Sequence, residues 1–113
     1  MIFITGPLYA GKRDAAAKLL GCSLSELPGR AVWDVQFLAA EETDLEALAE
    51  RLSRYEAVIA TEVGGGVIPL KRTERRARER AGRLAILLAA RADTVVRVLC
   101  GIPMILKGEA PCV

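Results

Sequence analysis

Histidine is absent from this chain of 113 residues. Its absence removes the commonest protein metal ligand and the usual proton shuttle near neutral pH. It also excludes every catalytic triad or dyad that depends on an imidazole. Any chemistry in this protein must therefore use other side chains.

Cysteines are few and scattered. The three of them, Cys22, Cys100 and Cys112, form no C-x-x-C pair, so neither a disulfide framework nor a zinc knuckle is predicted. Long apolar runs are also missing, and no basic leader precedes the opening residues 1–6, which argues against a signal sequence or a membrane span. We therefore expect a soluble protein of the reducing cytoplasm, with no membrane partner.

The composition is that of a folded domain with almost balanced charge. Apolar residues make up 52% of the chain, and 16 basic side chains face 14 acidic ones, for a net charge of +2. A chain of this length and composition can bury a real core without disulfides or metals. We predict one domain over residues 1–113.

Basic residues are concentrated between positions 71 and 83, where two acids accompany seven bases: Lys71, Arg72, Arg75, Arg76, Arg78, Arg80 and Arg83. No aromatic residues are interleaved with them, which disfavours a nucleic-acid surface. Most of them fall on the outward side of a predicted amphipathic helix, namely Arg72, Arg75, Arg76, Arg80 and Arg83. We predict no nucleic-acid partner, and expect this side to serve an anionic small ligand or a subunit contact.

Short apolar runs alternate with helical patterns, which is typical of βα units in a parallel sheet. The predicted strands cover residues 1–5, 30–37, 57–63 and 94–100. The predicted helices cover residues 12–20, about 44–52 and 73–92. Gly21 is expected to end the first helix and Thr43 to cap the second. Residues 101–103 should end the last strand, and the tail 104–113 should pack. The pattern predicts a small three-layer α/β sandwich with a mostly parallel sheet.

The sharpest local signal lies between the first predicted strand and helix. The run Gly6, Pro7, Leu8, Tyr9, Ala10, Gly11, Lys12 has the form G-x-x-x-x-G-K. Glycines let backbone N–H groups point inward at a phosphate, the helix N-terminus adds partial positive charge, and the lysine reaches the β and γ oxygens. The alternative is a plain turn between strand and helix. We predict that these residues, with the adjacent Arg13, bind a nucleotide.

Arg13 stands where such loops normally have a Ser or Thr that lends its hydroxyl to Mg²⁺. A guanidinium cannot ligate a cation. Two interpretations stay open: Arg13 places its own charge on a phosphate, or it repels the metal and leaves a site that binds anions without turnover. Either one weakens the case for Mg²⁺, and Asp14, 100° further round the helix, is a poor substitute ligand.

Two carboxylates are candidates for chemistry at the ends of strands. Asp34 lies inside the second apolar run, either as a metal-organising acid or as a solvated acid at a sheet edge. Glu62 ends the third run beside the glycines 64–66 and points toward the expected ligand crevice. We predict catalytic roles for Lys12, Asp34 and Glu62, with Glu62 the stronger of the two acids and Asp34 the one metal candidate.

Four ordered motifs in the second half of the chain resemble a known family. Residues 61–69, Thr-Glu-Val-Gly-Gly-Gly-Val-Ile-Pro, are similar to Asn-Glu-Val-Gly-x-Gly-(Ile/Leu)-Val-Pro of the adenosylcobinamide kinase / adenosylcobinamide-phosphate guanylyltransferase family of cobalamin biosynthesis. Residues 76–82 resemble its Arg-(Phe/Tyr)-Arg-Asp-x-x-Gly. Residues 92–95 match its Ala-Asp-x-Val, and residues 101–103 match its Gly-(Leu/Ile)-Pro, with Lys107 as the trailing lysine.

The resemblance implies a RecA-like P-loop fold, ATP or GTP at Gly6–Lys12, a homo-oligomer, and phosphorylation of the aminopropanol arm of a corrinoid. Members of the family are longer, and the missing part carries the histidine that accepts GMP. Guanylyl transfer by that route is therefore predicted to be lost. Four positions also depart from the motifs: Arg13, Thr61, Ala77 and Ala85.

Three hypotheses follow. The first is a shortened kinase-type enzyme. The second is a catalytically inactive relative that binds a nucleotide or a corrinoid, or that regulates. The third is an unrelated anion-binding α/β module, which would require the motif at residues 61–69 to be accidental.

Overall fold

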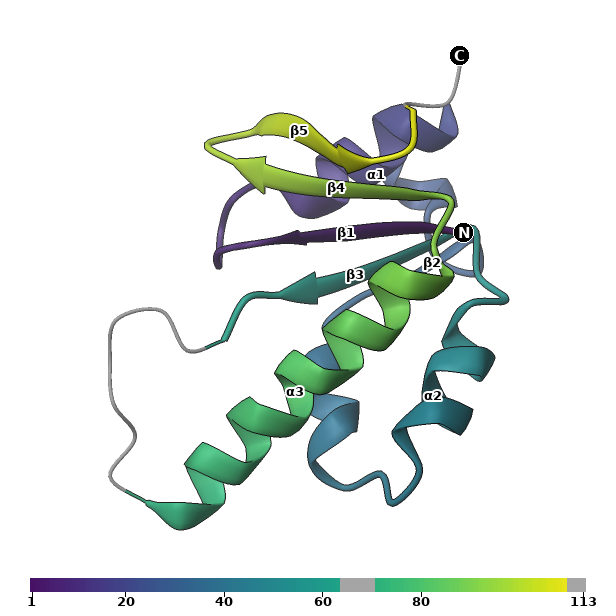
Figure 1. Ribbon diagram of the computed structural model, residues 1–113. Coiled ribbons are helices and arrows are strands. Elements are labelled where there is room, and N and C mark those ends of the chain that lie inside the picture. Colours follow the sequence, from purple (N-terminus) through teal and green to yellow (C-terminus); the bar gives the residue numbers. More distant parts are fainter. Residues whose placement is uncertain (64–70, 110–113) are drawn as a thin grey trace.

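The computed structural model describes residues 1–63 and 71–109. These residues form one five-stranded sheet in the order β2-β3-β1-β4-β5, flanked by helices (Figure 1). The strands are β1 (Ile2–Gly6), β2 (Ala31–Val32), β3 (Ala57–Thr61), β4 (Thr94–Leu99) and β5 (Ile102–Lys107). The helices are α1 (Lys12–Leu20), α2 (Leu45–Leu52) and α3 (Arg72–Arg91), with the 3₁₀ helices η1 (Leu24–Glu26) and η2 (Val35–Ala40). The first four strands are parallel, which confirms the predicted α/β fold with a mostly parallel sheet.

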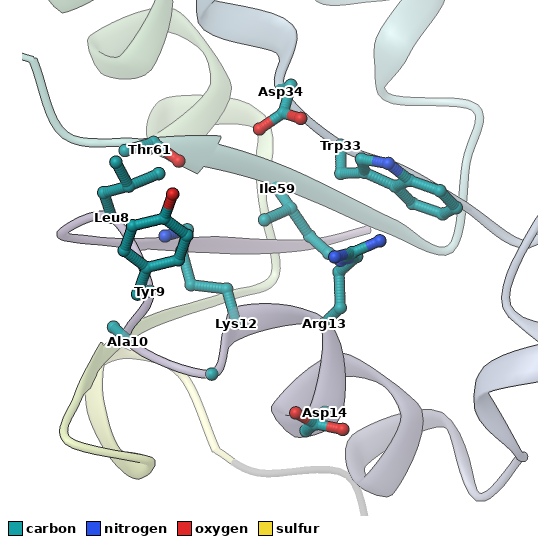
Figure 2. Close-up of a pocket in the computed structure, with 11 residues that line it drawn as sticks. Leu8, Tyr9, Ala10, Lys12, Arg13, Asp14, Trp33, Asp34, Ile59 and Thr61 are labelled. Atoms are coloured by element: carbon teal, nitrogen blue, oxygen red, sulfur yellow. The ribbon is translucent and has the colours of Figure 1, made fainter.

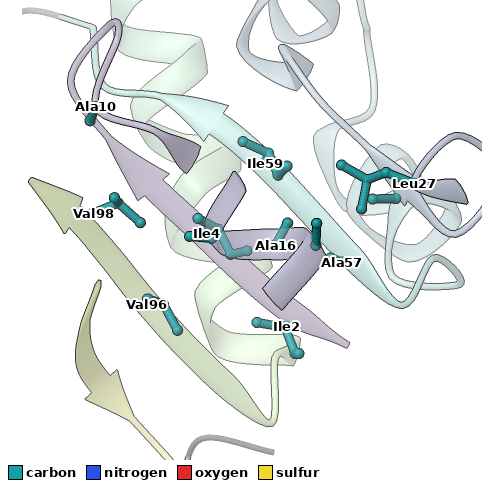
Figure 3. Packing of buried hydrophobic residues seen from close by; sticks show 12 residues of the cluster. Ile2, Ile4, Ala10, Ala16, Leu27, Ala57, Ile59, Val96 and Val98 are labelled. Atoms are coloured by element: carbon teal, nitrogen blue, oxygen red, sulfur yellow. The ribbon is translucent and has the colours of Figure 1, made fainter. Parts of the chain in front are cut away.

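The alternation of side chains along β1 separates two hydrophobic cores. Ile2 and Ile4 pack on the face covered by α1, together with Ile59 and Val96 of the neighbouring strands (Figure 3). Phe3 points to the opposite face and belongs to the core under α2, α3 and η2. The sheet is therefore the middle layer of three, and β1 at its centre is buried on both faces.

Two helix ends illustrate how well local signals predict boundaries. Gly21 ends α1 in the left-handed conformation, with φ of 66° and its N–H directed at the last helical carbonyls, as the sequence predicted. The cap of α2 is Asp44 rather than the predicted Thr43, and its carboxylate accepts from the backbone N–H of Ala47 at 3.2 Å. Because α2 begins at Leu45, only the residue immediately before it reaches that N–H group.

The second strand is much shorter than the predicted 30–37. It ends after Val32, because Asp34 takes a left-handed conformation with φ of 58° and begins η2. Aspartate tolerates this conformation better than a β-branched residue does. The apolar residues Val35 and Ala39 are buried from a 3₁₀ helix on the α3 side of the sheet instead of from a strand.

The fifth strand was not predicted. Residues 102–103, expected to end the preceding strand, and residues 104–107, expected to belong to a packed tail, form β5 and pair antiparallel with β4 through the turn at Gly101. All six are exposed, so the prediction that the apolar residues 104–107 pack against the domain is wrong. Pro103 is compatible with this position because β5 is an edge strand, where a missing N–H need not break the ladder.

Candidate functional site

The connection between β1 and α1 is a tight loop that only glycine permits at two positions. A Cβ on Gly6 would lie 2.4 Å from the carbonyl oxygen of Val98, so β4 excludes any side chain there. Gly11, immediately before α1, has φ of 90°, in the left-handed region. The N–H of Gly101 donates to the carbonyl of Ala10 at 2.8 Å, so the β4–β5 turn braces the loop from outside.

Lys12 is buried inside this loop. It is the first residue of α1, only 8% exposed, and its Nζ donates to the carbonyl oxygen of Pro7 at 2.6 Å. Burial lowers the pKa of the Lys12 ammonium, and the negative charges of Asp34 and Glu62 partly oppose that decrease. The fold therefore brings the predicted residues Asp34 and Glu62 within electrostatic reach of Lys12.

A cavity of about 460 Å³ opens beside the loop at the carboxyl ends of the strands (Figure 2). Its lining comprises Leu8, Tyr9, Ala10, Gly11, Lys12, Arg13, Asp14, Trp33, Asp34, Ile59 and Thr61. Figure 2 shows the loop residues and Arg13 on one side, and Trp33 and Asp34 on the other. In open α/β sheets this edge is where ligands bind.

Arg13 packs against the single tryptophan of the chain. Its guanidinium carbon lies 5.6 Å from the centre of the Trp33 ring, a cation–π distance. Both side chains line the cavity wall. Arg13 is thus held at the cavity by an aromatic partner from another part of the chain, which the sequence did not indicate.

Glu62 is engaged by a residue that sequence reasoning missed. Arg97 of β4 donates to both carboxylate oxygens, Nε at 2.6 Å and Nη2 at 3.0 Å. This bidentate contact lowers the pKa of Glu62, and the charge of Lys12 lowers it further. The backbone N–H of Glu62 donates to the carbonyl of Gly6 at 2.8 Å, which ties the end of β3 to the base of the loop.

The comparisons with known proteins agree with the motifs. A family model described as cobinamide kinase / cobinamide phosphate guanyltransferase matches residues 32–106. The chain belongs to this family. It is 40% identical over 77 residues to the bifunctional adenosylcobalamin biosynthesis protein CobP of Pseudomonas aeruginosa, an alignment that covers 67% of this chain and 44% of the relative. The chain thus spans less than half the length of that curated relative, and the resemblance predicted from the motifs is confirmed.

The loop at residues 6–12 lies before the segment that the cobinamide kinase family model matches. The family match therefore does not extend to this loop. The glycines 64–66 of the family motif and the residues 67–69 lie outside the described residues, as does Cys112.

Gln36 is a second residue of this family member that sequence reasoning missed. It is buried in η2, and its Oε1 accepts from the backbone N–H of Thr61 at 3.0 Å. This bond fixes η2, which begins next to Asp34, to the end of β3. A lone amide inside the apolar run 35–39 was the available signal, because buried polar groups generally have hydrogen-bond partners.

The basic helix α3 differs from the prediction at one arginine. Arg80, expected to point outward, is half-buried and donates from Nε to the carbonyl of Ala39 at 2.8 Å. It also donates from Nη2 to the carbonyl of Glu42. Ala39 lies in the last turn of η2 and Glu42 follows that helix, so one guanidinium fork holds the end of η2 and the chain beyond it.

Two searches of the described residues concern metals and membranes. Within residues 1–63 and 71–109, no three His, Cys, Asp or Glu side chains come together in a way that could hold a metal ion. Among the same residues, no helix combines the length and apolar character needed to cross a membrane.

Proposed function

We propose that the loop from Gly6 to Arg13 binds the phosphates of ATP or GTP, and that the domain is a kinase-type member of its family. The observation that carries this proposal is the buried Lys12 behind a glycine loop that leads into a helix. Inward N–H groups, a helix N-terminus and one ammonium are the parts that a phosphate site needs. The Pro7 carbonyl now bonded to Lys12 would give way to a phosphate oxygen.

The proposed reaction transfers the terminal phosphoryl group to a hydroxyl of cobinamide, as the family name indicates. The hydroxyl oxygen attacks the γ-phosphorus, the bond from that phosphorus to the β–γ bridging oxygen breaks, and the nucleoside diphosphate leaves. Asp34, across the cavity from Lys12 (Figure 2), accepts the proton from the hydroxyl. Lys12 stabilises the charge that develops on the transferred group.

Mg²⁺ does not fit the donors that this chain offers at the loop. Arg13 replaces the hydroxyl ligand, and Asp34 and Asp14 are the two carboxylates that line the cavity. Asp14 is the third residue of α1. Figure 2 shows its carboxylate well apart from that of Asp34. No step of the proposed reaction uses a protein-held metal ion, and Arg13 supplies the second positive charge at the site.

A catalytically inactive binding or regulatory relative is the second candidate. It is favoured by the arginine in place of the hydroxyl and by the absence of histidine, which removes guanylyl transfer through a phosphohistidine-type intermediate. In this case a nucleotide binds at the same loop, but no phosphate reaches cobinamide.

One experiment separates these candidates. Thermal unfolding is measured with ATP and with GTP, each with and without Mg²⁺. A ligand at 100 times its Kd should stabilise the protein by about 2.7 kcal/mol. Transfer of the labelled γ-phosphate to cobinamide is then measured, with Lys12→Met as the variant that should bind the nucleotide much more weakly. Nucleotide binding with phosphate transfer supports the kinase, and nucleotide binding without transfer supports the inactive relative. If the protein binds neither ATP nor GTP, both candidate functions are wrong.

We also propose that residues 1–113 fold as one domain and that the protein self-associates in the cytoplasm. The support for self-association is β5, an exposed edge strand whose apolar side chains include Ile102, Ile105 and Leu106. Sedimentation at several protein concentrations tests this, with Ile105→Lys expected to favour the monomer.

A further inference from the structure

The ion pair between Glu62 and Arg97 crosses over the central strand. Glu62 directly follows β3 and Arg97 lies in β4, and these two strands are not neighbours, because β1 lies between them. Adjacent strands are roughly 4.8 Å apart, so the backbones of β3 and β4 are separated by roughly 10 Å. Only two long side chains can meet across that gap. The pair spans β1 at Thr5 and Gly6, where the phosphate loop begins.

The same carboxylate is an electrostatic partner of Lys12. Glu62 and Lys12 each affect the other's pKa, yet no ion pair joins them in the part of the chain that the structure describes. Arg97 holds both oxygens of Glu62, and Lys12 donates to the Pro7 carbonyl. A neutral carbonyl is a weaker competitor for an ammonium than a carboxylate would be.

We propose that Arg97 is a positioning residue that holds the Glu62 carboxylate away from Lys12, so that the ammonium stays available to an oligophosphate. For its ligand this inference rests on the proposed function. Without Arg97, the Glu62 carboxylate, tied to the base of the loop by the bond from its own N–H to the Gly6 carbonyl, would turn to Lys12 and occupy the ammonium that should bind phosphate. The role of Arg97 is thus to prevent an ion pair inside the site.

Affinity for ATP in the absence of divalent metal tests the proposal by calorimetry. Arg97→Gln should weaken binding by about tenfold, the effect of one competing contact of 1.4 kcal/mol. The double variant Glu62→Gln/Arg97→Gln should return to within about twofold of wild type, because no carboxylate is left to compete. A double variant as weak as Arg97→Gln would overturn the proposal, since the ion pair would then matter only as a brace.

Two further measurements distinguish the long-range effect of the Arg97 charge from the effect of its contact with Glu62. Arg97→Lys keeps the charge but cannot hold both oxygens of Glu62, so it should bind ATP with intermediate affinity. The ratio of wild-type to Arg97→Gln affinity should persist at 0.5 M salt, where the Debye length is only about 4 Å. A ratio that falls to one at high salt, with Arg97→Lys equal to wild type, would contradict the proposal.

A second readout needs no nucleotide. The chain has four lysines, Lys12, Lys18, Lys71 and Lys107, so NMR of the side-chain amines is simple, and Lys12→Arg identifies the signal of Lys12. The freed Glu62 should raise the pKa of Lys12 in Arg97→Gln, and the double variant should reverse this rise. Asp34 acts on Lys12 in all of these variants and cancels in the comparison. An unchanged Lys12 pKa would overturn the inference, whereas failure of wild type to bind ATP would overturn only the proposed function.

The chain offers a matched control pair. Arg30 also holds both oxygens of a glutamate, Glu56, with Nε at 2.7 Å and Nη2 at 2.9 Å. This pair lies at the amino ends of the strands, and neither residue lines the cavity. Arg30→Gln removes the same charge and the same geometry, and it should leave both the ATP affinity and the Lys12 pKa at their wild-type values.

Discussion

The two ends of the sheet use the same pair of side chains for different purposes. At the amino ends, Arg30 and Glu56 face solvent and join neighbouring segments. At the carboxyl ends, Arg97 and Glu62 cross a strand and lie in the field of the buried Lys12. Arginine–glutamate geometry alone therefore says little about a role. The difference lies in what surrounds each pair, since all parallel strands direct their loops and their ligand crevice to one edge.

The largest effect should come from removing the ammonium of that edge. Lys12→Met should weaken ATP binding by about 2–5 kcal/mol, the loss expected when one partner of a buried charged hydrogen bond is removed. It should not destabilise the fold, because the buried ammonium carries a desolvation cost that methionine avoids. Calorimetry and thermal unfolding measure the two effects. A variant that binds as tightly as wild type would refute the phosphate site itself.

The same group can be titrated instead of mutated. Burial lowers the pKa of Lys12 in the folded protein below its ordinary 10.5. At a pH between the lowered pKa and 10.5, the unfolded chain therefore binds more protons than the folded one. Stability should therefore rise with pH in this window. Affinity for ATP should fall in the same window, because the ammonium is lost. Lys12→Arg, which stays charged, should show neither trend when Kd and unfolding are measured from pH 7 to pH 10.5.

The next largest effect should come from the loop's contact with β4. Gly6→Ala would place a Cβ at 2.4 Å from the Val98 carbonyl oxygen. It should lower the free energy of unfolding by about 1–3 kcal/mol, and it should also weaken the binding of ATP. Gly82→Ala is the control, because its Cβ has no neighbour within 4 Å. A helical alanine there should stabilise α3 by about 0.5–1 kcal/mol. Urea unfolding distinguishes the two, and equal effects would contradict the model of a loop seated on β4.

Sequence alone predicted the elements whose causes are local. The bounds of α1, the glycine turn before it and the cap at Gly21 all follow from residues within a few positions of one another. The family was also predictable, because its motifs are short and ordered. The register of β1 between β3 and β4 has no local cause, because it depends on pairing between segments more than fifty residues apart in the sequence.

The parts that sequence did not predict depend on that pairing. The contact of Arg97 with Glu62 joins residues 35 positions apart and depends on the order β3-β1-β4 in the sheet. The segment 30–37 has the composition of a strand, but a left-handed Asp34 ends the strand early, and residues 35–37 belong to a 3₁₀ helix that the bond from Thr61 to Gln36 holds in place. The strand β5 was hidden for the opposite reason, since none of its side chains is buried.

An effect of similar size on stability should come from Gln36. Gln36→Met keeps the volume of the side chain but leaves the Thr61 N–H without its acceptor, at a cost of about 1–3 kcal/mol. Hydrogen exchange of the Thr61 amide should accelerate, while amides at the amino end of β3 keep their protection relative to global stability. If the Thr61 amide stayed protected, Gln36 would not be what fixes η2 to the carboxyl edge.

The smallest effect should come from the amino edge. Arg30→Gln breaks an exposed ion pair, and exposed pairs contribute little because water and salt screen them and the two side chains lose freedom. The melting temperature should fall slightly at low salt and converge on wild type at high salt, while affinity for ATP stays unchanged throughout. If Arg30→Gln weakened ATP binding as much as Arg97→Gln, the contrast between the two edges would fail. A long-range field would then explain both variants, because proximity to Lys12 is the feature that separates these otherwise equivalent pairs.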